Sequence, residues 1–125
     1  MPEPLRPAYD VFGFAPGIRT ENDLVISGMI GADANLAIPE ALDEEVRAAF
    51  GAIGLVLEEA GARFSNVISL RSFHVSDTLQ NDANVFLKVK GEFMDEPHCA
   101  WTMAGVSSLL IPAARVEIEA VARLG

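Results

Sequence analysis

One apolar stripe constrains the fold of this chain more than any other feature of its sequence. Between Pro39 and Gly61, apolar residues recur at steps of four, four, three and four positions: Leu42, Val46, Phe50, Ile53 and Leu57. Residues at this spacing lie on one face of an α-helix. Proline suits the first helical position, and glycine suits the residue that follows the last one. The pattern therefore predicts a long amphipathic helix from Pro39 to Gly61, whose apolar face must pack on another layer.

The segments on either side of this helix indicate that the other layer is a β-sheet. Residues 12–19 (FGFAPGIR) and 24–31 (LVISGMIG) flank the turn-like TEND and predict a hairpin, in which Gly28 permits a bulge. Residues 66–75 (NVISLRSFHV) form a short run rich in β-branched residues, which favours a strand. Residues 115–123 (RVEIEAVAR) alternate in the way expected of a closing strand.

A second helix is expected between the last two of these strands. Ser76 or Asp77 can cap its start, and the DEP at 95–97 ends it, because the residue before a proline is disfavoured in a helix. Its apolar stripe consists of Leu79, Ala83, Phe86, Val89 or Lys90, and Phe93. Residues 100–106 (AWTMAGV) then form a strand. The order ββαβαββ predicts one α+β domain, residues 1–125, with two helices on one face of the sheet.

Such an arrangement leaves one face of the sheet without helices. The strands nevertheless carry apolar residues on both faces, and a large apolar surface on a soluble protein marks an interaction site. The sequence therefore predicts an oligomer.

Composition excludes several classes of function. The chain has a formal net charge of −9 and only nine Lys and Arg residues, which opposes binding to nucleic-acid phosphates. No apolar run approaches the roughly 18 residues of a membrane span. The N-terminus has no signal-peptide pattern, and the single cysteine, Cys99, permits no intrachain disulfide. We therefore expect a cytoplasmic protein.

Four segments carry a resemblance to a known family. LVISGMIG, LEEAGA, NVISLRSFHVSD and VEIEAVA resemble, in order and spacing, the corresponding segments of the RidA family, also called the YjgF family. The resemblance extends from about Phe12 to the end of the chain. It implies a chorismate mutase-like fold and a homotrimer with a cleft at each subunit boundary. It also implies hydrolysis of enamines and imines such as 2-aminoacrylate to 2-oxo acids and ammonia, without metal or cofactor.

This chemistry makes modest demands on a cleft. The carbon of an iminium group is already electrophilic, so a site needs to hold the substrate, position a water molecule and move protons. A substrate carboxylate also needs a cation, for which the arginine fork is well suited. In the family that cation is the arginine of a P-A-R-S/T segment. In PHCAWTMAG, residues 97–105, the matching position is Trp101.

Three further positions depart from the family pattern toward less polar residues. Phe14 stands where the family has a cleft tyrosine, Phe86 near its asparagine and Met103 at its cysteine. The resemblance thus implies that these residues, with Trp101, contact substrate. Equally, aromatic residues and methionine often serve only packing at the core or an interface.

The residues that match the family pattern are Glu117 and Ser27. The resemblance implies that Glu117 handles the proton of the attacking water and that Ser27 assists orientation. Without the resemblance, Glu117 would be interpreted as part of a solvated strand face and Ser27 as a hydroxyl bonded to backbone. His98 is expected at the rim of the cleft, and its spacing from Cys99 does not indicate a metal site.

These departures lead to a hypothesis about specificity. A cleft with aromatic walls and one carboxylate should prefer a neutral or cationic ligand of low polarity, because a buried substrate carboxylate would lack a partner. Arg19, Arg71 or Arg115 would restore the clamp if one of them reached the cleft. A non-catalytic trimer that binds a small molecule is the main alternative function. RNA cleavage, which the acidic charge opposes, and a trimeric scaffold are the others.

Overall fold

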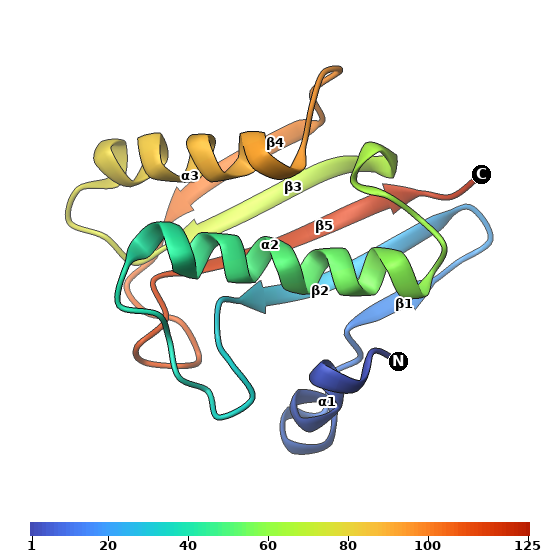
Figure 1. The fold of residues 1–125 in the computed structure, drawn as a ribbon, viewed down its shortest axis with the longest axis horizontal. Coiled ribbons are helices and arrows are strands. Elements are labelled where there is room, and N and C mark those ends of the chain that lie inside the picture. The colour runs from blue at the N-terminus through green and yellow to red at the C-terminus, as the bar shows by residue number, and fades with distance from the viewer.

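The computed structural model describes residues 1–125 and contains one five-stranded sheet with two long helices along one face (Figure 1). No helix is long and apolar enough to cross a lipid bilayer. Two 3₁₀ turns, Glu3–Leu5 and Phe64–Asn66, accompany the helices and strands. In chain order the helices and strands are α1 Arg6–Phe12, β1 Gly17–Arg19, β2 Asp23–Ile30, α2 Leu42–Glu59, β3 Val67–His74, α3 Leu79–Phe93, β4 Ala100–Gly105 and β5 Val116–Arg123.

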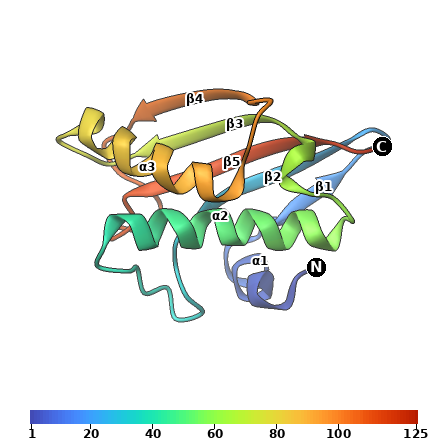
Figure 2. The same cartoon turned by 45° about the horizontal axis from the view of Figure 1, so that its top comes forward.

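The strands lie in the order β1-β2-β5-β3-β4. All neighbours are antiparallel except β3 and β4, which are parallel. Parallel neighbours need a crossover connection, and α3 provides it. Figure 2 shows α2 and α3 on the same side of the sheet. The predicted α+β class, the strand order along the chain and the placement of both helices on one face are confirmed.

The core lies between these two helices and the sheet. Phe50 of α2 is fully buried, and its ring centroid lies 5.2 Å from that of Phe93 and 5.5 Å from that of Phe86, both on α3. From β5, the alternate residues Val116, Ile118, Ala120 and Ala122 face this core. The residues between them face the other side, which we call the open face.

The N-terminal segment differs from its prediction. The strand expected over 12–19 is limited to Gly17–Arg19, and the preceding residues form α1, which the sequence pattern did not predict. Gly13 ends α1 with a φ of 71°, a conformation that glycine adopts without strain. The helix lies below the sheet, before the start of β1, and adds no strand to it (Figure 1).

The predicted helix starts were wrong, whereas the predicted stop was confirmed. Helix α2 begins at Leu42, and Pro39 lies before it, with its carbonyl accepting a hydrogen bond from Arg115. The N-cap of α3 is Thr78 instead of Ser76 or Asp77. Gly61 follows α2 with a φ of 72°, as expected of a terminating glycine.

A buried histidine makes the stability of the fold depend on pH. His74 is 2% exposed, Phe86 meets its ring edge-on at 5.2 Å, and its Nε2 has no hydrogen-bond partner. Burial lowers the pKa of His74 below its ordinary value of 6.5, against a smaller opposing effect of Asp82. The unfolded state therefore binds the proton more readily, so stability is complete above pH 6.5 and is lost as the pH falls below it.

Urea unfolding between pH 7.5 and 5 would measure this loss. We expect the free energy of unfolding to fall by up to about 1.4 kcal/mol per pH unit below the unfolded pKa of His74. His74→Phe should flatten this dependence, whereas His98→Phe, at an exposed position, should leave it intact. Equal slopes in the wild type and His74→Phe would contradict the assignment.

Candidate active site

A cavity of about 520 Å³ opens where β1 stops and β2 continues. Pairing between β1 and β2 ends at Gly17 and Ile26. On that side, the last residues of β2 therefore border the cavity instead of a strand, while on the other side they pair with β5. Helix α1 and the loop after β2 form its other walls. The aromatic and polar residues of its lining, together with the glycine between them, are Phe12, Phe14, Ser27, Gly28, Asp33, Glu117 and Glu119.

A bulge in β2 shapes the floor of this cavity. Ile26 pairs with Ala120 and Met29 with Ile118, so β2 has one more residue than β5 between these pairs. The extra length falls at Ser27 and Gly28. A Cβ placed on Gly28 would lie 2.7 Å from Cδ of Glu117, so the absence of a side chain there makes room for this carboxylate.

Glu117 is half-buried at this bulge. It lies in the middle of the sheet, where β5 pairs with Ile30 of β2 on one side and Phe73 of β3 on the other. Burial, and secondarily the charge of Glu119, raise the pKa of Glu117 above its ordinary value of 4.5. A carboxylate that is less stable in its ionised form is a better proton acceptor, as a general base requires.

Ser27 is anchored beside it by the backbone before β1. Its Oγ donates a hydrogen bond to the carbonyl of Ala15 at 2.6 Å, and its N–H donates to that of Pro16 at 2.9 Å. The hydroxyl proton is therefore committed, but the oxygen can still accept a hydrogen bond from a ligand. This geometry suits orientation of a ligand and does not suit a nucleophile.

The predicted substrate-binding residues separate into two groups. Phe14 lines the cavity with Ser27 and Glu117. Phe86 and Trp101 lie on the helix-covered side of the sheet, where their rings stack at 5.4 Å. Phe86 is fully buried, so within one subunit it has no surface to offer a ligand. Glu117 lies on β5, two strand spacings or roughly 10 Å from β4, and it projects from the opposite face of the sheet, so one subunit does not bring Trp101 to Glu117.

Trp101 has polar and apolar partners of its own. Its indole Nε1–H donates to Oγ of Ser72 at 2.9 Å, and strand β4 pairs it with Leu70 of β3. Met103 is partly buried two residues further along the same edge strand, beside Ser72. Trp101 packs against the edge of the core, and both residues are partly buried on the edge strand of the sheet.

The segment before β4 holds the remaining candidates. The His98 side chain is 65% exposed, and its Nε2 lies 3.9 Å from a carboxylate oxygen of Glu96. Cys99 is partly buried, and this burial raises the pKa of its thiol, which disfavours the reactive thiolate. No group of three or more His, Cys, Asp and Glu side chains is arranged to hold a metal ion.

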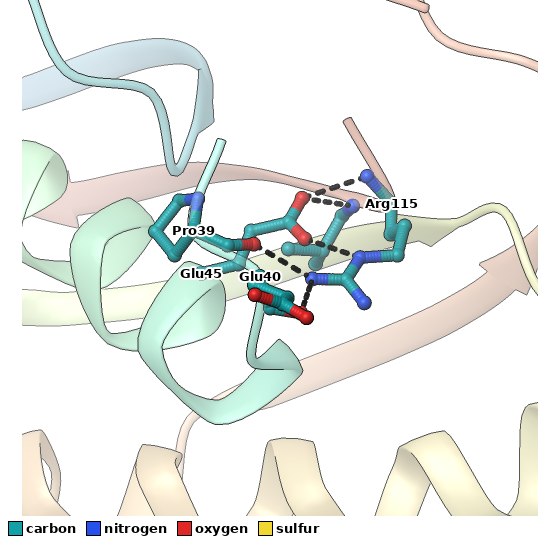
Figure 3. A network of polar contacts seen from close by, with 5 residues as sticks. Pro39, Glu40, Glu45 and Arg115 are labelled. Carbon is teal, nitrogen blue, oxygen red and sulfur yellow. Dashed lines mark hydrogen bonds and ion pairs between the residues drawn. The ribbon is translucent and has the colours of Figure 1, made fainter. Parts of the chain in front are cut away.

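None of the three candidate arginines lines the cavity. Arg115 is bound to the buried Glu45 through its Nε at 2.7 Å and to two backbone carbonyls through Nη2 (Figure 3). Arg71 of β3 points to the open face, with Nη1 at 3.6 Å from Glu119. Arg19 lines a separate, smaller pocket near the N-terminus. The cavity therefore contains no cation from its own subunit.

Two features of this site were not predicted from the sequence. The wall formed by α1 depends on a helix whose short pattern gave no periodic signal. The second is that Glu119 lines the same cavity as Glu117. The alternation in VEIE placed both carboxylates on one face of the strand, since residues two apart share a face, but it did not indicate that the cavity extends to Glu119.

Fold and site together define a small α+β protein with an acidic cavity at the edge of its sheet. The family model for endoribonuclease L-PSP matches residues 7–124 of the sequence. The chain therefore belongs to this family, which includes RidA, and the resemblance inferred from the four segments is confirmed.

Relatives with known names support the same assignment. RutC family protein YjgH of Escherichia coli is 30% identical over 112 residues, which cover 89% of this chain and 82% of that protein. The 2-iminobutanoate/2-iminopropanoate deaminase of Dermatophagoides farinae is 29% identical over 122 residues, which cover 96% and 88%.

Solved structures match the fold closely. The structure of protein YjgH superposes with a TM-score of 0.83 at 29% identity and covers 93% of this chain and 87% of its own. RidA from an Antarctic Psychrobacter species has the same TM-score, 0.83, at 23% identity, with 91% and 90% covered. The second likeness concerns the fold alone.

The close approach of Gly28 to Glu117 gives a prediction. In Gly28→Ala the new methyl group would push the Glu117 carboxylate from its position. If Glu117 takes part in a reaction, a shift of about 1 Å can reduce turnover by about 100-fold. The expected cost in stability is small, because a flexible side chain yields. Gly51→Ala in α2 is a matched control with open space around the new methyl group. Steady-state kinetics and urea unfolding of both variants would test this, and full activity in Gly28→Ala would contradict it.

Proposed function

We propose that this protein hydrolyses a small imine or enamine to a carbonyl compound and ammonia, with Glu117 accepting a proton from the attacking water. The observation that carries this proposal is the half-buried Glu117 carboxylate, whose pKa is raised, at the floor of an open cavity. Such a group can act as a general base near neutral pH. Ser27 supports the role by presenting a hydroxyl oxygen next to Gly28. A relative that is named as a deaminase of 2-iminobutanoate and 2-iminopropanoate agrees with this reaction class.

The proposal includes a homotrimer with clefts between subunits. The open face carries Ile18 and Val25, which are 56% and 46% exposed and need cover, and Ile68 at the irregularity of β3 is 47% exposed. In such an assembly the edge strand β4 of a neighbouring subunit, with Trp101, Met103 and His98, would border the cavity. Light scattering of the purified protein would give three times the 13.4 kDa mass of one chain.

Ammonia release from freshly generated imines would test the activity. The panel should contain imines with and without an α-carboxylate, and each rate should be compared with spontaneous hydrolysis in buffer. Acceleration of either set supports the proposed function. A trimer that accelerates none of them would instead be a non-catalytic protein that binds a small molecule.

A further inference from the structure

The charges that line the cavity are all of one sign. Of its 21 lining residues, 14 are hydrophobic, three are carboxylic acids and none is lysine, arginine or histidine. One of these acids, Asp33, already has hydrogen-bond partners: its Oδ1 accepts hydrogen bonds from the backbone N–H groups of Asn35 at 2.8 Å and Ala37 at 3.0 Å. Glu117 and Glu119 remain as the charged groups that a ligand would meet.

The two glutamates occupy alternate positions of β5 and project from the same face. Their Cα atoms are therefore about 6.8 Å apart, which allows them to contact different atoms of one small ligand. Glu117 lies over the bulge, against Gly28, and lines the open cavity. Glu119 is two residues away, opposite Arg71 in the sheet register.

The ion pair between Glu119 and Arg71 leaves Glu119 able to bind a ligand. Nη1 of Arg71 lies 3.6 Å from Oε1 of Glu119, and the side chains are 65% and 39% exposed. A pair this long and this exposed is weak, since water competes with it. A desolvated cation in the cavity would bind the same carboxylate more strongly.

The wall of the cavity adds a second reason to expect a cation. Phe12 and Phe14 both line it, and the faces of aromatic rings attract positive charge. Apolar surface, aromatic rings and a carboxylate together suit an organic cation. From this subunit, an α-carboxylate would meet no partner in the cavity and two charges of its own sign.

We propose that the cavity selects cationic, apolar ligands without a carboxylate, and that Glu119 binds their positive charge. This inference deepens the proposed function and rests on it for the reaction. The substrate class is a protonated imine with apolar substituents, whose N–H donates to Glu119. Water adds to the imine carbon and gives a proton to Glu117. After proton transfer to nitrogen the C–N bond breaks, so that R₂C=NH₂⁺ and H₂O yield R₂C=O and NH₄⁺.

Binding of three unreactive probes tests this inference apart from catalysis. Cyclohexylmethylammonium, cyclohexylmethanol and cyclohexanecarboxylate have the same ring and differ mainly in charge. Titration calorimetry of the full chain should find the ammonium probe bound at least about tenfold more tightly than the alcohol, as expected of a charge-assisted hydrogen bond. The carboxylate should bind most weakly.

Variants then identify the residue that binds the charge. Glu119→Gln should remove the preference for the ammonium probe and leave the affinity for the alcohol unchanged. Glu58→Gln removes the same charge from an exposed position of α2 and should change neither affinity. Circular dichroism would confirm that the variants are folded, and the comparison of probes in the wild type needs no variant.

The outcomes separate this inference from the proposed function. Preferred binding of the carboxylate, equal binding of all three probes, or no binding would overturn the inference, and loss of carboxylate binding in Arg71→Gln would identify Arg71 as the clamp. If Glu119→Gln retained the ammonium preference, its assignment would be wrong. A wild type that binds the ammonium probe through Glu119 but hydrolyses no imine would uphold the inference and refute the hydrolase. Hydrolysis restricted to 2-imino acids would support the hydrolase and refute the inferred selectivity for ligands without a carboxylate.

Discussion

Glu117→Gln should reduce imine hydrolysis by about 100- to 10,000-fold, the usual contribution of a general base. Glutamine has nearly the same size as glutamate but cannot accept the proton of water at neutral pH. The kinetic change should fall mainly on kcat, because the amide still fills the space above Gly28. Ammonia release over a range of substrate concentrations would separate kcat from KM.

Glu58→Gln is the matched control, because it removes one carboxylate from an exposed site outside the cavity. It should retain the wild-type rate. A rate that is lost equally in both variants would point to a general effect of charge and contradict the assignment of Glu117.

The pH dependence follows from the raised pKa of Glu117. Since only the ionised carboxylate accepts a proton, kcat should fall on the acidic side at a pH above the ordinary value of 4.5. The same shift means that the folded state binds this proton more tightly than the unfolded state, so stability declines as the pH rises through the folded pKa. Glu117→Gln should therefore be at least as stable as the wild type at pH 7, although its rate of hydrolysis is expected to be much lower. An unstable variant would make lost activity uninformative.

Glu45→Ala should destabilise the fold by about 1–3 kcal/mol, the usual cost of leaving buried hydrogen-bond donors without a partner, because Arg115 itself is 37% exposed. Glu45 is fully buried at the start of α2. Its carboxylate accepts hydrogen bonds from the Nε and backbone N–H of Arg115, both at 2.7 Å, and from the N–H of Val116 at 3.3 Å (Figure 3). Alanine would leave two backbone donors at the start of β5 without a partner. Urea unfolding at pH 7 would measure the change.

An exposed ion pair on the surface provides the comparison for Glu45→Ala. Arg47 and Glu92 form a similar two-point pair at 2.8 Å, but both side chains are about 40% exposed. Glu92→Ala should cost less than about 1 kcal/mol, because water replaces an exposed partner. If the two alanine variants had equal effects, burial would not be the reason for the strength of the Glu45 pair.

The regular elements were predictable because each depends on residues close together in sequence. The stripe from Leu42 to Leu57 was sufficient to identify α2, and alternation was sufficient to identify β5. Helix α1 was not predicted, because its seven residues span about two turns, which is too short for a helical period to be recognised. The prediction that Pro39 starts the helix was wrong for a different reason. Its carbonyl accepts a hydrogen bond from Arg115, which is 76 residues away in the sequence.

The site was predictable only in part. The match to the family pattern, rather than alternation or composition, indicated Glu117 and Ser27, which the fold does bring together at one cavity. Trp101 lies on the opposite side of the sheet because of the register of β4 beside β3, which no local pattern specifies, and Phe86 lies there because α3 packs on that side. Sequence alone also left open which arginine could replace the missing one, and the structure places Arg115 in the core network with Glu45.

The sequence by itself determined the fold class, the helix-covered face of the sheet and the family, because periodic burial and short motifs are local properties of a chain. The tertiary structure decided which charges share the cavity. Glu119 joins Glu117 there, whereas Arg115, which is close to both in sequence, is bound to Glu45 on α2. Electrostatic selectivity depends on distance and burial, and these are fixed only when segments far apart in sequence pack together.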